Sequence, residues 1–172
     1  ENVSSLFMAL MNPEDRVNIE EFQSFSDRIA YIRIPYVLDL NTEVAIYRNT
    51  FGRHIDQSFL PRVLHNFARV IISTRLATRS EGLLEWIEVP GRYSRYCDPN
   101  LHLLKMEIYT GRIPPWLTDA DRKRFTAKRR RRILAEGEEE GTSGLSGRDS
   151  LKIFNEFYAT FYRDNKLINM SM

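Results

Sequence analysis

Two apolar segments near the start of the chain constrain its fold more than any other feature. The run from Ser5 to Met11 ends at Asn12-Pro13, and the β-branched segment from Ile29 to Ile34 is closed by Pro35. Both are typical of buried strands, although a short helix is an alternative for the first. Because two strands do not form a stable sheet alone, we expect this part to be the end of a larger α/β domain.

After Pro35 the hydrophobic periodicity becomes helical. Apolar residues at i, i+3 and i+4 spacing predict a helix from Leu60 to Ile71, and Ser146 with Asp149 predicts a capping box before a last helix over 147–163. Between them we expect a basic helix over 119–135 and a loop over 136–146. The predicted fold class is mainly α, with one or two short strands followed by five or six helices.

Composition excludes several classes of protein. Hydrophobic residues make up 42% of the 172 residues, which excludes global disorder, and the net charge of only +2 excludes a uniformly basic nucleic-acid binder. Cys97 is the only cysteine, so an intrachain disulfide framework is excluded. No apolar run reaches the ~20 residues of a membrane span and no basic leader is present, so we expect a soluble cytoplasmic chain.

Motifs for self-sufficient catalysis are missing from the sequence. None of the eight glycines is followed by lysine, so there is no phosphate-binding loop of the Gly-Lys-Ser/Thr kind. The three histidines stand alone, and no His or Cys spacing indicates a zinc site. We therefore expect no complete catalytic set within this chain.

A basic run and an aromatic helix suggest two binding functions. Eight cations lie in the segment from Asp121 to Arg132, and they could bind nucleic acid. Alternatively, they could form a solvated helix face whose charge is balanced by the glutamates at 136–140. Only Phe125 is interleaved for stacking, so nucleic acid is not the favoured partner. Aromatic residues over 151–162 could mediate protein association, although core packing is the simpler interpretation.

Three polar residues stand where nucleotide-handling proteins place ligand contacts. Asn12 ends the first predicted strand, where open α/β sheets bind ligands. Arg28 precedes the second predicted strand, where an arginine could reach a neighbouring subunit's phosphate. Arg148 lies in the first turn of the last helix, a position that disfavours a cation unless an anion is bound there. Each also has a simpler interpretation, as a turn residue or a solvated arginine.

The order of these residues resembles the second half of an AAA+ ATPase. More specifically, the stretches Phe25-Ser26-Asp27-Arg28-Ile29-Ala30-Tyr31-Ile32-Arg33-Ile34-Pro35-Tyr36 and Gly144-Leu145-Ser146-Gly147-Arg148-Asp149 are similar to the PrkA-type bacterial serine protein kinases. The resemblance covers most of the chain and is clearest at its two ends, whereas residues 78–132 are not matched.

The resemblance implies roles that the residues alone do not establish. Residues 1–40 would be the edge of an AAA+ α/β core, 41–165 a helical lid and 166–172 a tail, with the phosphate-binding motifs before Glu1. Asn12 would be sensor 1, Arg28 an arginine finger and Arg148 sensor 2, contacting ATP phosphate.

The same resemblance implies cofactors and partners. The full-length parent would use ATP and Mg²⁺, self-associate in a ring and phosphorylate a protein substrate. The region to which kinase activity is attributed would largely follow Met172. This chain alone is expected neither to bind nucleotide tightly nor to be active. The alternative is a non-catalytic helical module that uses residues 122–132 for nucleic acid or 151–162 for protein association.

Overall fold

The structure is a computed structural model that describes residues 8–11, 28–162 and 166–169. The chain divides into two units, Glu1–Ile34 and Pro35–Met172. In the first unit, the described residues form neither helix nor strand, and Leu10, Ile32 and Ile34 are exposed. The predicted strand over 29–34 is therefore wrong, and residues 8–11 of the earlier segment are not a strand either. The physical reason is that these segments have no neighbouring strand among the described residues to accept their backbone hydrogen bonds.

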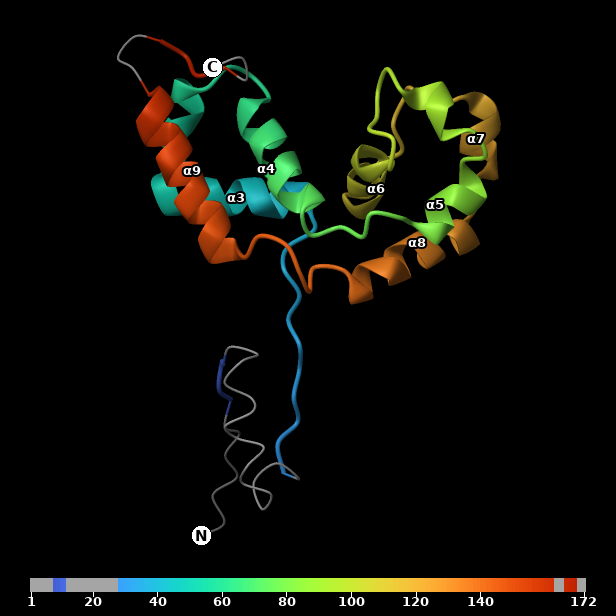
Figure 1. Ribbon diagram of the computed structural model, residues 1–172, viewed down its shortest axis with the longest axis horizontal. Coiled ribbons are helices and arrows are strands. Elements are labelled where there is room, and N and C mark those ends of the chain that lie inside the picture. Colours follow the sequence, from blue (N-terminus) through green and yellow to red (C-terminus); the bar gives the residue numbers. More distant parts are fainter. Residues whose placement is uncertain (1–7, 12–27, 163–165, 170–172) are drawn as a thin grey trace. The chain divides into compact units, whose positions relative to one another are not determined.

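The second unit is helical, as the sequence predicted (Figure 1). An isolated parallel β-bridge joins Phe59 and Ile168. No described helix is long and apolar enough to span a bilayer. In chain order the elements are α3 (Leu40–Phe51), the 3-10 helix η2 (Arg53–Ser58), α4 (Val63–Ser73), α5 (Glu81–Trp86), the 3-10 helix η3 (Pro90–Tyr93), α6 (His102–Tyr109), α7 (Asp119–Arg124), α8 (Ala127–Glu139) and α9 (Gly147–Phe161).

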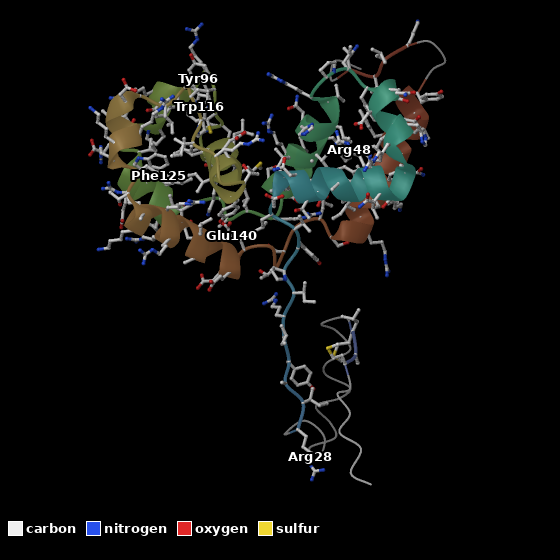
Figure 2. The ribbon with its side chains drawn as sticks, turned by 180° about the vertical axis from the view of Figure 1, so that it is seen from behind. Arg28, Arg48, Tyr96, Trp116, Phe125 and Glu140 are labelled. Carbon is white, nitrogen blue, oxygen red and sulfur yellow. The ribbon has the colours of Figure 1, made fainter. Side chains whose placement is uncertain are left out.

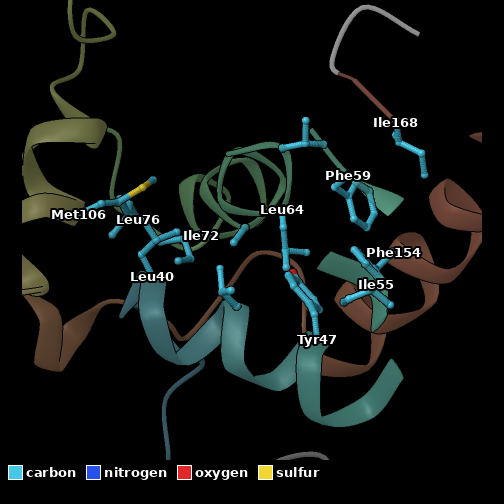
Figure 3. Packing of buried hydrophobic residues seen from close by; sticks show 13 residues of the cluster. Leu40, Tyr47, Ile55, Phe59, Leu64, Ile72, Leu76, Met106, Phe154 and Ile168 are labelled. Atoms are coloured by element: carbon cyan, nitrogen blue, oxygen red, sulfur yellow. The ribbon is translucent and has the colours of Figure 1, made fainter. Parts of the chain in front are cut away.

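The first hydrophobic cluster joins α3, α4 and α9 (Figure 3). Its centre is Phe154, which is fully buried and stacks on Tyr47 with ring centroids 4.8 Å apart. The aromatic residues of the last helix thus pack against the chain's own core, in agreement with the simpler interpretation of that pattern.

The second hydrophobic cluster is built around Trp86, with residues of α5, α6 and α8. Helix α6 serves both clusters, because Met106 belongs to the first while Leu104 and Ile108 belong to the second. Cys97 lies in the second cluster, where burial raises the pKa of its thiol to about 11. This cysteine is therefore a buried, protonated thiol at neutral pH.

The basic segment is two helices rather than the single helix predicted over 119–135. Phe125 ends α7 and stacks on Trp86 at a centroid distance of 4.4 Å. The Thr126 side chain then accepts from the backbone N–H of Arg129 and starts α8. The break between the two helices thus falls where Phe125 stacks on Trp86. Helix α8 also continues to Glu139, into the segment predicted as a loop.

Glycine is required where the loop after α8 meets the end of α4. Gly144 has φ = 86°, and a Cβ there would collide with the carbonyl group of Thr74. Gly147, three residues later, is the first residue of α9 and has open space around the same position.

These two glycines provide a matched test of the packing. We expect Gly144→Ala to lower the free energy of unfolding by about 2 kcal/mol or more, from backbone strain and the collision. Gly147→Ala should change it by less than about 1 kcal/mol, because the helical backbone accepts alanine there. Urea denaturation measures both, and equal effects would contradict the close approach at Thr74.

Candidate functional site at the start of helix α9

The start of α9 is fixed by the capping box that the sequence predicted. The Ser146 hydroxyl accepts from the backbone N–H of Asp149, and the Asp149 carboxylate accepts from the backbone N–H of Ser146. The Ser146 hydroxyl also donates to the Asp149 carboxylate at 2.7 Å, and this bond, together with the one from the Ser146 backbone N–H, lowers the pKa of Asp149. The carboxylate is therefore ionised at neutral pH and lies in the turn where the helix dipole favours a negative charge.

Arg148 is the second residue of α9 and is exposed. It forms no salt bridge with any carboxylate in the described part of the chain, although its charge contributes to the lowered pKa of Asp149. A guanidinium in the first turn of a helix, where the helix dipole is positive, is a favourable arrangement for an anion such as phosphate.

The loop before α9 is attached to the end of α4. The backbone N–H of Leu145 donates to the Thr74 hydroxyl at 3.1 Å, and the Leu145 carbonyl accepts from Nε of Arg75 at 2.7 Å. Nearby, the backbone N–H of Gly141 donates to the carbonyl of Arg75. The contacts of Leu145 with Thr74 and Arg75 therefore hold the start of α9 in place.

Arg75 is buried and paired with a buried carboxylate from α3. Its Nη1 lies 2.9 Å from Oε2 of Glu43, and the two side chains are 1% and 2% exposed. The other carboxylate oxygen accepts from Ser150 on α9 and from the Tyr47 hydroxyl. Burial raises the pKa of Tyr47, so its phenol stays protonated and donates. The arginine network (Glu43, Tyr47, Arg75 and Ser150) thus joins α3 and α9 to the segment that follows α4.

The same guanidinium also binds the segment that precedes α3. Nη1 of Arg75 donates to the carbonyl of Val37 at 2.8 Å, and the backbone N–H of Tyr36 donates to the carbonyl of Gly141 at 2.7 Å. Residues 36–37 and the start of α9 are therefore linked through one side chain.

A second buried network, the lysine network, surrounds Lys105, whose side chain is fully buried. Its Nζ lies 2.6 Å from both Oε2 of Glu136 and Oε1 of Glu140 (Figure 2 labels Glu140). Ser80 and Tyr109 donate to these carboxylates as well. Glu136 and Glu140 were expected to balance the charge of the basic run, but they neutralise the buried Lys105 instead.

The remaining predicted site residues lie outside this arrangement. Arg28 is exposed and belongs to the unit Glu1–Ile34 (Figure 2), and Asn12 lies outside the described residues. Sequence reasoning missed Glu43, Arg75 and Lys105. The sequence did contain one signal for Lys105, because this lysine stands within an apolar stretch. Three leucines and a histidine precede it in Leu101–Leu104, and Met106 follows it. No group of three His, Cys, Asp or Glu side chains suited to a metal occurs among the described residues.

Comparison with protein families identifies the C-terminal part of the chain. Residues 103–172 match the family model described as PrkA serine protein kinase C-terminal domain. This match supports a PrkA-type protein, in agreement with the family named from the sequence, but it does not test the AAA+ part of that resemblance. It also begins the family's C-terminal domain at residue 103, whereas the resemblance placed the kinase-attributed region largely after Met172. It includes Arg148 and also residues 103–132, which the resemblance left unmatched, whereas Arg28 precedes the matched region. Neither a curated protein nor a solved structure matches the chain.

Breaking the arginine network should destabilise the fold strongly. We expect Arg75→Met to lower the free energy of unfolding by about 3–5 kcal/mol, since Glu43 would be left buried without its partner. Arg48→Met is the matched control, because Arg48 pairs with Asp56 at the surface and such pairs contribute about 1 kcal/mol or less. Chemical denaturation distinguishes the two, and equal losses would show that the buried pair does not stabilise the fold.

The lysine network should make stability depend on pH. Burial alone would raise the pKa of Glu136, but hydrogen bonds from Lys105, Ser80 and Gly82 outweigh it and lower the pKa below its ordinary value of 4.5. The ionised form therefore stabilises the fold above that pH, and the contribution is lost as the pH falls through the lowered pKa.

Substitution of Glu136 tests this dependence. Between pH 6 and pH 3 the melting temperature should fall less in Glu136→Gln than in the unsubstituted protein. Glu138→Gln, at an exposed neighbouring position, should follow the unsubstituted protein. Parallel acid profiles for all three proteins would contradict the assignment.

Proposed function

We propose that this chain is part of an ATP-dependent serine protein kinase of PrkA type, in which Arg148 contacts a phosphate of ATP. The observation that carries the proposal is the family match over residues 103–172. The matched region includes Arg148, an exposed arginine in the first turn of α9 that forms no salt bridge with any residue the structure describes. ATP and Mg²⁺ are the proposed cofactors of the full-length protein. Bound ATP supplies the γ-phosphate for transfer, and phosphoryl transfer depends mainly on positioning and charge stabilisation.

The proposed role of the described helices is to couple phosphate binding to helix position. A phosphate oxygen at the start of α9 would be held by the guanidinium of Arg148 and the first helical N–H groups. The arginine network then connects this helix to the segment at Val37. Loss of the γ-phosphate removes the partner of Arg148 and favours a different position of α9.

The proposal includes two further residues and the assembly. We propose Arg28 as an arginine finger directed at a neighbouring subunit's ATP, and Asn12 as the sensor that orients the attacking group. Both roles imply self-association, with a protein as the phosphorylation substrate. Support for them comes from the resemblance of the N-terminal stretch. The aromatic face of α9 packs internally, so we do not propose it as an association surface.

Substitution of Arg148 in the full-length protein tests the proposal. Arg148→Ala should lower ATP turnover by roughly tenfold or more, because a charge contact to phosphate is removed. Lys152→Ala is the matched control, since Lys152 is an exposed cation one helical turn further along α9. Its turnover should stay within about twofold of the unsubstituted protein. Equal turnover in both variants would refute the role of Arg148.

A further inference from the structure

An exposed aromatic pair lies beside the loop between α6 and α7. Trp116 stacks on Tyr96 with ring centroids 5.7 Å apart and an interplanar angle of 5° (Figure 2). Tyr96 is 55% exposed and Trp116 is half-buried. Tyr93 packs against the inner side of Trp116 at 5.3 Å, so the pair is supported from within the fold. Flat aromatic faces at a surface can stack with other planar groups.

Three arginines surround this loop. The guanidinium of Arg122, on α7, donates to the carbonyl of Pro115, the residue before Trp116. Arg112 and Arg130 line a small cavity together with Phe125, and a Cβ on Gly111 would lie 3.7 Å from Nη2 of Arg130. The cavity volume of about 40 Å³ accommodates a water molecule or one phosphate oxygen.

The positive charge of these arginines is not neutralised locally. All three are exposed, and none forms a salt bridge with a carboxylate in the described part of the chain. The nearby carboxylates are engaged elsewhere, with Glu88 paired to Arg124 and Glu107 paired to Arg69. Asp119, at the start of α7, is the one exposed acidic residue in the loop-to-α7 segment 111–124. The surface therefore has an excess of guanidinium groups, which match phosphate geometry.

We propose that this basic-aromatic surface (Tyr96, Arg112, Trp116, Arg122 and Arg130) binds single-stranded nucleic acid. Unpaired bases stack on exposed aromatic rings while arginines hold the backbone phosphates, a combination that does not depend on sequence. Nucleic acid presents both groups at regular spacing, with a phosphate for the arginines and a base for the rings in each nucleotide, whereas an acidic protein would need aromatic side chains placed beside its carboxylates. The inference is independent of the proposed kinase function, because none of the five residues contributes to it.

The basic run has few aromatic rings for stacking, and in the folded chain such rings come from other segments. Phe125, the aromatic residue within the run, is stacked on the buried Trp86 and is half-buried. The stacked pair comes instead from the exposed Tyr96 and the half-buried Trp116, which lie outside the run in the sequence. Folding therefore adds stacking groups to a segment that carries only charge.

Fluorescence anisotropy with the complete chain tests the proposal. The probe is a labelled 20-nucleotide oligothymidine, with duplex DNA of the same length and a polyglutamate peptide as competitors. Arg112→Glu/Arg130→Glu should weaken binding at least tenfold and reduce the dependence of log K on log salt concentration. The matched control is Arg53→Glu/Lys152→Glu, which changes the net charge equally at exposed cations of η2 and α9. It should weaken binding no more than about threefold.

A second variant separates stacking from charge. Tyr96→Ala should weaken binding of oligothymidine about fivefold or more without changing the salt dependence, since an exposed ring and no charge is removed. Circular dichroism confirms folding of each variant. The proposal is overturned if oligothymidine does not bind, if both charge-reversal variants lose affinity equally, or if Tyr96→Ala binds normally. It is also overturned if polyglutamate displaces the probe as well as unlabelled oligothymidine does, which would identify an acidic protein as the partner.

Discussion

The guanidinium group of Arg75 is the interaction on which the rest of the helical unit depends. It is buried, and it binds a carboxylate of α3, a carbonyl of the segment before α3 and a carbonyl of the loop before α9. A buried cation is tolerated only where its donors are satisfied, so these segments are held in one arrangement. The exposed Arg148, three residues after Leu145, takes its position from this arrangement.

Lys105 has a comparable role in the other half of the unit. Glu136 and Glu140 lie one turn apart on and just after α8, so both carboxylates reach the same ammonium group. Helix α6 carries Lys105 between the two hydrophobic clusters, and the ion pairs fix α8 against it. Charged groups inside the unit therefore help to fix the positions of α6 and α8.

Sequence reasoning predicted the helical elements better than the first segments. The capping box at Ser146 and Asp149 follows from local sequence rules, and it is present in the structure. The strand predicted over 29–34 failed because strand formation requires a partner that the apolar pattern does not specify. Likewise, the split of the basic helix depends on Trp86, a residue about forty positions away from Phe125.

The candidate site was predicted only in its exposed part. Arg148 was identified because a cation in a first helical turn conflicts with the helix dipole. Glu43 and Arg75 carry no comparable local signal, since their pairing depends on how α3 and α4 pack. The stacked Tyr96 and Trp116 were missed for the same reason, because twenty residues separate them in the sequence.

The arginine network also has a consequence for the order of folding. Arg75 contacts Glu43 across 32 residues of sequence but reaches Leu145 across 70, and Ser150 reaches Glu43 across 107. During synthesis, α3 and α4 are complete long before α9 exists. The pair of Glu43 and Arg75 therefore forms early and incompletely satisfied, and the closure of a long loop completes it. Among the described helices, the one that carries Arg148 is thus the last to join its cluster, and Ile168 follows it in the chain.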